Sequence, residues 1–359
     1  MKEQTMAAIP FFDGHNDFLL RLLNAPMQRD EIWLEGDGAG HLDLPRMQKA
    51  GFAGGFFAIY LPSPHEENAP DYQAMMDAPP YDLPLPDLMT ADQTQVTALT
   101  MAGHLMWMER ASKGALKICR SSADLRACME TGTIAAIMHM EGAEAIGPDL
   151  DALFAFHAMG LRSIGPVWSR PTVFGHGVPF RFPGDPDTGP GLTDAGKDLV
   201  RACNELRIII DLSHLNERGF NDVASLSDAP LVATHSNAHA VTQSTRNLTD
   251  RQLAMIRESG GMVGLNYATV FLREDGRKAT DCGWDPVMRH LDYLVVKLGE
   301  DHVGFGSDFD GAELPDVIGD VTGVQALIGQ MREHQYGEEL IEKIARKNWI
   351  ALLERTWGA

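Results

Sequence analysis

Eight compact apolar runs recur along the chain, and segments with helical spacing of apolar residues separate them. Runs of this length and composition are typical of parallel strands that are buried on both faces. The alternation predicts an α/β protein with a (β/α)8 TIM barrel. A doubly wound open sheet is the alternative, but no GxGxxG motif follows a predicted strand. The predicted strands are 9–13, 51–60, 133–140, 162–167, 207–212, 230–234, 260–266 and 302–307, and helices are expected at 97–112, 149–159, 193–205, 249–258 and 284–298.

Two long inserts interrupt this alternation, one after the second predicted strand (61–96) and one after the fourth (169–192). Both are rich in proline, and both carry aromatic residues such as Tyr81 and Phe180. A disordered linker between two domains fits these aromatic residues poorly. On a barrel, both inserts would leave from the carboxyl ends of strands and stand over the active-site face. We therefore expect residues 1–359 to form a single domain.

The amino-acid composition of the chain argues against nucleic-acid and membrane partners. The formal net charge of −20 disfavours binding to nucleic acid, because phosphates would be repelled. The 4 cysteines form no CxxC pair and are interpreted as core residues of a reducing compartment. No apolar run approaches the roughly twenty residues of a membrane span, and no leader is evident near the start. The expectation is a cytoplasmic protein without a nucleic-acid or membrane partner.

Side chains that can bind metals stand at the ends of five of the eight predicted strands. The first run ends in His15 and Asp17, which project from the same side because strand side chains alternate. The carboxyl ends of barrel strands lie on one face, so these side chains should converge. This convergence predicts a metal centre. The other four ends carry Glu141, His214, His235 and Asp308.

The ligand types indicate the metal and the chemistry. Imidazoles combined with carboxylates suit Zn2+, or another first-row ion such as Mn2+ or Fe2+, better than Ca2+ or Mg2+. A carboxylate shared by two ions would place them about 3.5–4 Å apart. A hydroxide held between them stays ionised near neutral pH, because the pKa of metal-bound water falls to about 7. The pattern therefore favours a hydrolase with a binuclear centre.

Order, spacing and flanking residues of the motifs agree with one family from about residue 9 to about residue 350. These motifs are Asp13-Gly-His-Asn-Asp17, Met140-Glu-Gly142, Ser213-His214, Thr234-His-Ser236, Ser244-Thr-Arg-Asn247 and Gly306-Ser-Asp-Phe-Asp-Gly311. On these motifs the chain resembles the membrane (renal) dipeptidases, which are binuclear zinc enzymes of the amidohydrolase superfamily.

The resemblance implies a role for each matching residue. Two Zn2+ ions per subunit would be bound, one by His15 and Asp17 and the other by His214 and His235, with Glu141 bridging them. Arg246 would hold the C-terminal carboxylate of the substrate, which suits a planar guanidinium. Asp308 would take a proton from the nucleophile and pass it to the leaving amine.

One position departs from the family pattern. The family has a histidine after the fourth strand that donates to the substrate carbonyl, whereas this chain has Trp168 there. Either the Trp168 indole N–H replaces that donor, or His176 folds back into the site. His139 stands two residues before Glu141, so a hydrogen-bonding role beside the metal ligands or a packed core position is expected for it.

The expected function is hydrolysis of dipeptides that carry a free C-terminal carboxylate, and the family resemblance implies that a D-residue at that end is tolerated. Another amidohydrolase activity, such as N-acyl amino acid deacylation, would use the same centre. Arg246 discriminates between these activities, because a substrate without a carboxylate gains nothing from it. A metal-binding barrel without catalysis is the third possibility, and Asp308 argues against it. The expected partner is a dipeptide substrate, and a homodimer is compatible with the resemblance because dimers occur in that family.

Overall fold

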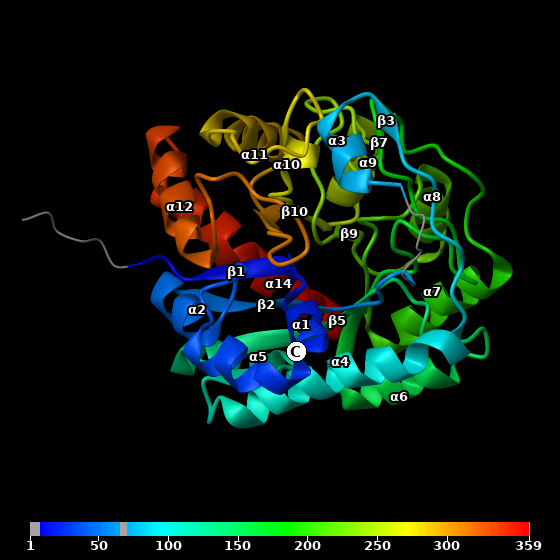
Figure 1. The fold of residues 1–359 in the computed structure, drawn as a ribbon, viewed down its shortest axis with the longest axis horizontal. Coiled ribbons are helices and arrows are strands. Elements are labelled where there is room, and N and C mark those ends of the chain that lie inside the picture. The colour runs from blue at the N-terminus through cyan, green and yellow to red at the C-terminus, as the bar shows by residue number, and fades with distance from the viewer. Residues whose placement is uncertain (1–7, 65–69, 359) are drawn as a thin grey trace, which may run out of the picture.

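The computed structural model describes residues 8–64 and 70–358. A parallel sheet lies at its centre, with neighbours in the order β8-β6-β5-β2-β1-β11-β10-β9 (Figure 1). A single parallel bridge between Asp211 and Val232 connects the two ends of this order. The predicted TIM barrel is therefore confirmed as a nearly closed barrel of eight parallel strands. These strands are β1 (Phe11–Asn16), β2 (Phe52–Tyr60), β5 (Ile134–Glu141), β6 (Leu161–Ile164), β8 (Ile209–Ile210), β9 (Val232–Ala233), β10 (Met262–Leu265) and β11 (Val303–Phe305).

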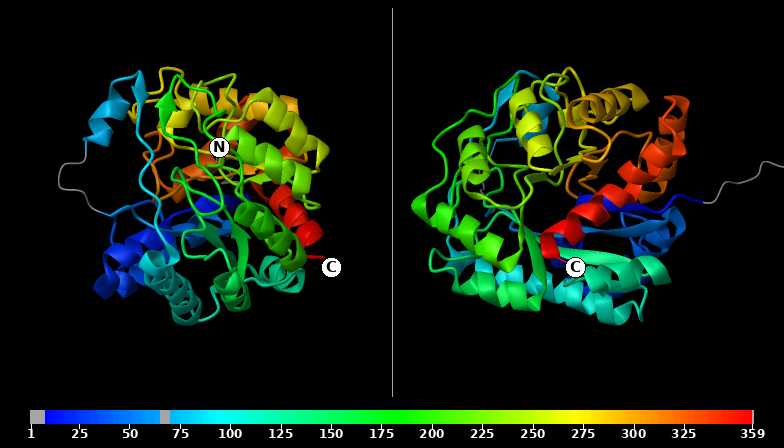
Figure 2. Two further views of the ribbon diagram at one scale, coloured as in Figure 1. Left: turned by 90° about the vertical axis from the view of Figure 1, so that its right-hand side faces the viewer. Right: turned by 180° about the vertical axis from the view of Figure 1, so that it is seen from behind.

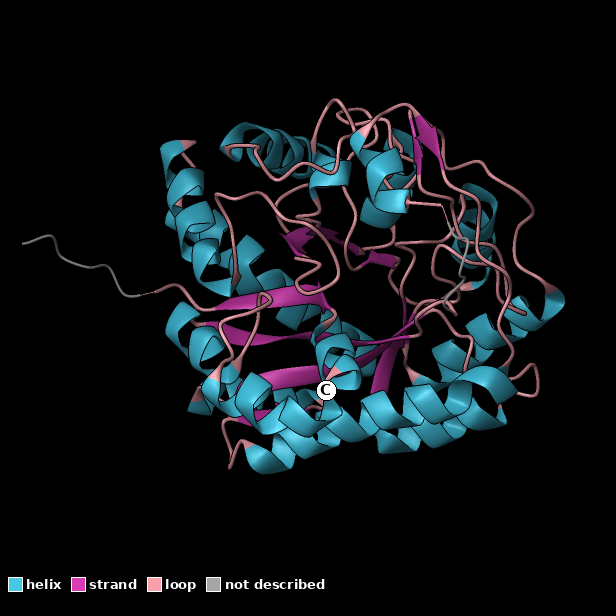
Figure 3. Cartoon of the chain, viewed as in Figure 1, coloured by secondary structure: helices cyan, strands magenta, loops and turns pink. Residues whose placement is uncertain are grey.

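Helices surround this sheet, as Figure 3 shows. A short strand, β4 (Leu116–Ile118), extends the sheet outside the barrel by pairing with the first half of β5. The α-helices are α1 (Phe18–Asn24), α2 (Leu44–Ala50), α3 (Tyr72–Asp77), α4 (Ala91–Ala111), α5 (Ser122–Thr131), α6 (Asp151–Met159), α7 (Asp194–Leu206), α8 (Glu217–Leu226), α9 (Asp250–Glu258), α10 (Thr269–Leu272), α11 (Trp284–Leu298), α12 (Val324–Glu333), α13 (Glu338–Glu342) and α14 (Asn348–Trp357).

Three predicted elements differ clearly from the structure in their boundaries. The fifth and sixth strands, predicted at 207–212 and 230–234, have only two residues each in β8 and β9. The residues after β8 keep part of the pairing, because the N–H groups of Asp211 and Leu212 donate to the carbonyls of Ile164 and Val232 at 2.8 Å. Helix α4 begins at Ala91 rather than at 97, because Thr90 and Gln93 form a capping box at its start.

The last helix packs against the interior of the barrel. Trp349 of α14 belongs to a buried cluster with Phe12, Phe56 and Ile137 of the strands. Its indole Nε1 donates to the carbonyl of Phe305 on β11 at 2.9 Å. In the rear view of Figure 2, the red α14 crosses in front of the strands. This packing fills one part of the barrel with apolar side chains and leaves the carboxyl ends of the strands free for polar ones.

The two inserts meet over those carboxyl ends. The first insert contains α3 and β3 (Tyr81–Asp82), and its residues 65–69 lie outside the described part of the chain. The second contains β7 (Arg181–Phe182), which pairs with β3 in an antiparallel two-stranded sheet. A separate apolar cluster of residues from the inserts and from the loop around α10 supports this cover, with Met76, Tyr81, Val270 and Phe271 among its members. In residues 8–64 and 70–358, no helix has the length and apolarity needed to cross a membrane.

Candidate metal centre

Five side chains predicted as metal ligands converge at the carboxyl end of the barrel. His15 is near the end of β1 and Asp17 follows that strand, while Glu141 is the last residue of β5. His214 follows β8, and His235 follows β9. The Oε1 atom of Glu141 lies 3.0 Å from Nε2 of His214, 3.3 Å from Nε2 of His235 and 3.7 Å from Nε2 of His15. One carboxylate oxygen therefore faces three imidazole nitrogens, as a shared metal ligand would.

The contacts around these residues fit a metal centre better than a set of ordinary hydrogen bonds. The Nε2 atoms of His214 and His235 face each other at 3.2 Å, and Nε2 of His15 lies 3.3 Å from Oδ2 of Asp17. In the described part of the chain, Oδ1 of Asp17 has no hydrogen-bond partner. All five side chains are buried. Divalent cations would offset the buried carboxylates, and the nitrogen and oxygen donors suit first-row metals.

Burial and mutual charge shift the pKa values of these groups in opposite directions. Burial raises the pKa of Glu141 well above its usual value. Burial opposes protonation of His15, but the charges of Glu141 and Asp17 outweigh it and raise the His15 pKa to about 10. Burial, with Arg246 and His15 nearby, lowers the pKa of His214 and of His235 well below the usual value. The His214 and His235 imidazoles are therefore neutral, which is the form that binds metals.

Hydroxyl groups hold two of the imidazole rings in place. Oγ of Ser169 lies 2.9 Å from Nδ1 of His214, and Oγ1 of Thr234 lies 2.8 Å from Nδ1 of His235. Thr234 in turn donates from Oγ1 to Asp211 at 2.6 Å. Such contacts fix the ring orientation and leave Nε2 directed at the metal.

Asp308 lies beside the ligands of the first strand. Its carboxylate, His15 and Asp17 each offer an atom within 4.8 Å of the other two. The Oδ2 atom accepts a hydrogen bond from Nδ2 of Asn266 at 2.9 Å. Burial raises the Asp308 pKa, and the charge of Asp17 adds to this effect. A carboxylate with a raised pKa is a stronger base than an ordinary surface carboxylate, which suits a group that accepts a proton.

Arg246 is buried behind the two imidazoles. Its Nη1 donates to the carbonyl of Ser213, and its Nη2 donates to the carbonyl of His235 at 3.1 Å. The guanidinium carbon lies 5.2 Å from the centre of the Phe271 ring. Burial lowers the Arg246 pKa to about 10, so the side chain stays charged at neutral pH. In the described part of the chain, its Nε has no hydrogen-bond partner.

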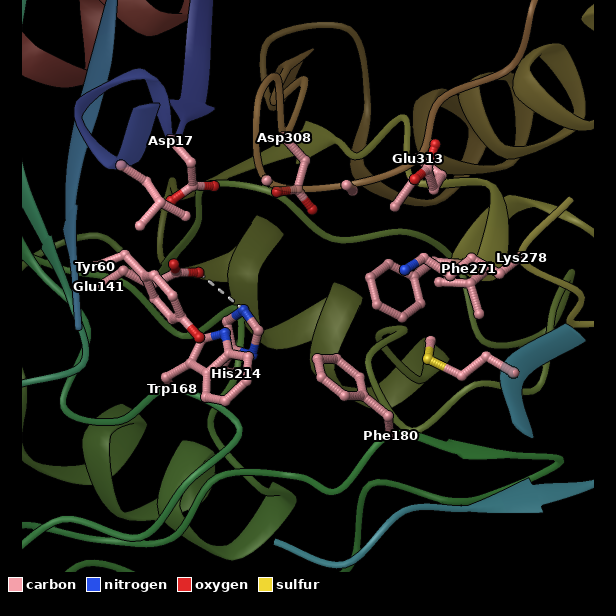
Figure 4. Close-up of a pocket in the computed structure, with 16 residues that line it drawn as sticks. Asp17, Tyr60, Glu141, Trp168, Phe180, His214, Phe271, Lys278, Asp308 and Glu313 are labelled. Atoms are coloured by element: carbon pink, nitrogen blue, oxygen red, sulfur yellow. Dashed lines mark ion pairs between the residues drawn. The ribbon is translucent and has the colours of Figure 1, made fainter. Parts of the chain in front are cut away.

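A cavity of about 320 Å³ opens directly on this centre. In Figure 4, Asp17, Glu141, His214 and Asp308 lie at one end, and Phe180, Phe271 and Lys278 lie towards the other. The walls between them are mostly apolar. The lining residues are Asp17, Leu20, Tyr60, Met76, Glu141, Trp168, Phe180, His214, Ala268, Val270, Phe271, Lys278, Asp308, Gly311, Ala312 and Glu313.

The structure separates the two residues that were considered for the missing family histidine. Trp168 lines the cavity, and its ring centre is 5.9 Å from that of His214 and 5.2 Å from that of Tyr60. His176 lines a different depression, with Asp82 and Arg181 of the paired inserts. The structure therefore brings Trp168 to the centre and does not bring His176 there.

Several residues that line the cavity or contact its lining were not found from the sequence. Tyr60 ends β2 opposite Glu141 in the strand register, and Asn266 follows β10 beside Asp308. Their places at strand ends were a usable signal, although neutral side chains are less distinctive there than histidine or aspartate. Lys278 and Glu313 come from loops, where the sequence carries no comparable signal.

Comparison with known proteins agrees with this geometry. The family model of the membrane dipeptidases (peptidase family M19) matches residues 1–357. A metallo peptidase from Rhodobacter sphaeroides, solved with a phosphinate mimic of the dipeptide L-Ala-D-Ala, is 69% identical with a TM-score of 0.96, covering 98% of this chain and 100% of that one. Dipeptidase AC, a metallo peptidase of family M19, is 68% identical with a TM-score of 0.96 and the same coverage. The Klebsiella pneumoniae protein named "Uncharacterized protein in pqqA 5'region" is 49% identical over 246 residues, which are 68% of this chain and 91% of that protein.

Proposed function

The chain belongs to the membrane dipeptidase family and is a metallo-dipeptidase, and from this premise we propose that two Zn2+ ions form its centre and that its substrates are dipeptides with a free C-terminal carboxylate. The observation that carries this proposal is the single Glu141 oxygen that faces three imidazoles at 3.0–3.7 Å. A bridging carboxylate between two sets of donors is what a two-metal centre requires.

Each ion has its own set of ligands in this proposal. His15 and Asp17 hold one zinc, His214 and His235 hold the other, and Glu141 contacts both. When bound, the zinc ions polarise the peptide carbonyl and make water nucleophilic at neutral pH. The side chains bind the zinc ions at the open, carboxyl end of the barrel, where the cavity gives a short substrate access.

The cavity supports a small substrate with a terminal carboxylate. A volume of about 320 Å³ lies at the small end of the range for ligand pockets and leaves little room for a longer peptide. Arg246 supplies the positive charge for the carboxylate, from its place behind His214 and His235. The relative bound to a mimic of L-Ala-D-Ala supports acceptance of a D-residue at the C-terminal position.

Two further groups act on the reacting bond. Asp308 accepts a proton from the attacking water and returns it to the leaving amine, and Asn266 holds its carboxylate in place. Trp168 takes the place of the family histidine and donates its indole N–H to the carbonyl oxygen, since it lines the cavity beside His214. Where oxyanion donors have been removed from enzymes, the loss is about 3–4 kcal/mol.

Metal analysis combined with a substrate survey tests this function. Purified protein should contain two zinc ions per chain, and it should release amino acids from L,L and L,D dipeptides. The same dipeptides with a C-terminal amide serve as the matched control, because they keep the scissile bond and lose the carboxylate. Equal rates on acids and amides would contradict the role of Arg246. Preferential cleavage of N-acyl amino acids would instead support a deacylase.

A further inference from the structure

The three imidazoles of the centre are not supported equally. A histidine that binds a metal through one nitrogen needs a hydrogen-bond partner for the other, which fixes the ring. Ser169 supplies this partner to His214, and Thr234 supplies it to His235. Nε2 of His15 faces Asp17 and Glu141, so Nδ1 is the nitrogen that needs support. In the described part of the chain this Nδ1 is buried and has no hydrogen-bond partner.

A second polar group without a partner lies beside it. His139 is fully buried on β5, and its ring packs edge-on against His15 with the ring centres 5.3 Å apart. Its Nδ1 lies 2.9 Å from Oγ of Ser163, while its Nε2 has no hydrogen-bond partner among the described residues. Asp211 completes the group, with its Oδ2 3.5 Å from that Nε2. His15, His139 and Asp211 each offer one atom within 4.8 Å of the other two.

We propose that His139 is a positioning residue for His15. Together with Asp211, it provides the buried polar partner that the Nδ1–H group of His15 requires. His139 thereby does for the first ion what Ser169 and Thr234 do for the second. This inference rests on the two-metal centre of the proposed function, and it assigns a role to a histidine that binds no metal itself.

One water molecule shared by the three side chains would satisfy Nδ1 of His15 and Nε2 of His139, the two atoms that have no partner among the described residues. It accepts from Nδ1–H of His15, donates to Asp211 and bonds to Nε2 of His139 in either tautomer. Three atoms at most 4.8 Å apart can each lie at hydrogen-bond distance from one such water. Buried waters usually make about three hydrogen bonds to otherwise unpaired groups. The alternative, a third metal ion, fits poorly because Asp211 already accepts hydrogen bonds from the backbone and side chains of Ser213 and Thr234.

Two substitutions at one position separate hydrogen bonding from packing. His139→Met keeps an apolar side chain of similar length and removes the polar group, whereas His139→Gln retains a group that can bond to the water. Zinc affinity is measured for each ion by titration against a competing chelator. We expect His139→Met to release one of its two ions about 10–100-fold more readily, while the other ion is unchanged. His139→Gln should stay within about threefold of the wild type, since the hydrogen bond is kept.

The control is His290→Met, at another fully buried histidine, whose hydrogen bonds go to Ala238, Thr242 and Leu272 rather than to a metal ligand. It should lower the thermal stability of the zinc-free protein and leave both zinc affinities unchanged. Unchanged affinities in His139→Met, equal weakening of both ions, or equal effects of Met and Gln at position 139 would each overturn the inference. A wild-type protein that binds fewer than two zinc ions would instead refute the proposed function, and the inference with it.

Discussion

Replacement of Asp308 by Asn tests the proton-transfer step with very little structural change. Asp308 has a left-handed backbone conformation (φ 62°), and asparagine is one of the few residues that adopts it readily. The amide oxygen of the new side chain can still accept the 2.9 Å hydrogen bond from Asn266. The side chain keeps its shape and loses its negative charge and its ability to carry a proton.

The expected loss follows from this difference. A positioned general acid or base contributes about 100- to 10,000-fold to a rate. Each factor of ten corresponds to about 1.4 kcal/mol, so the barrier should rise by about 3–5 kcal/mol. We expect kcat for a dipeptide to fall by that factor while KM stays within about threefold, because the substrate contacts at Arg246 and Trp168 remain. Both zinc ions should still be bound.

The assay is steady-state release of amino acids by zinc-loaded protein, with the metal content of each preparation measured in parallel. Asp310→Asn is the matched control, because Asp310 is on the same loop and has the same left-handed backbone (φ 65°). Its carboxylate accepts from the backbone N–H of His41 at 2.6 Å and does not line the cavity. Its kcat should stay within about threefold of the wild type. An Asp308→Asn protein that holds both ions and keeps full activity would refute the reasoning.

Three further perturbations have clear expected results. A methyl group in Gly311→Ala would collide with the carboxylate of Asp17, so zinc content and activity should both fall when measured on the same preparation. Ser169→Ala removes the partner of Nδ1 in His214, and chelator titration should show one ion weakened about 10–100-fold. Burial lowers the His290 pKa to about 3 in the folded protein, whereas the pKa in the unfolded chain is near 6.5. Below pH 6.5 the unfolded chain therefore binds one more proton than the folded protein, and stability decreases as the pH decreases. Denaturant titrations of the zinc-free protein, kept metal-free by a chelator, measure the free energy of unfolding at each pH. Between pH 7.5 and 5 this free energy should fall by about 2 kcal/mol more in the wild type than in His290→Gln. Equal losses would contradict this assignment.

The metal ligands could be predicted from the sequence because they are ionisable residues at the ends of apolar runs. His15 and Glu141 are distinctive because each ends an apolar run, and barrel topology then brings such ends to one place. Tyr60 and Asn266 occupy equivalent positions, but a neutral side chain after an apolar run has many ordinary explanations. The family resemblance added the pairing of ligands to ions, which no spacing along the chain contains.

Loops and strand ends were less predictable, for physical reasons. The apolar run within residues 207–212 indicates a buried strand, but it does not show that the regular ladder covers only Ile209 and Ile210 and continues as a single bridge at Asp211. The choice between Trp168 and His176 depended on the path of the second insert, which has no periodic pattern. The start of α4 was recoverable from Thr90 and Gln93, although the proline-rich sequence before them concealed it.

The sparse pairing between β8 and β9 affects which part of the protein unfolds first. Among the described residues, backbone pairing across this junction consists of the Asp211–Val232 bridge with the Leu212 N–H bond to Val232, and side-chain hydrogen bonds of Asp211 and Ser213 supplement it. His214 and His235 stand on opposite sides of the junction. An ion bound by both histidines ties together the place where the barrel has the least backbone pairing. Removal of zinc should therefore speed amide hydrogen exchange first at Leu212 and Thr234, whose N–H groups cross the junction, and only later in β2 and β5. The ions that perform the chemistry would then also decide which part of the molecule unfolds first.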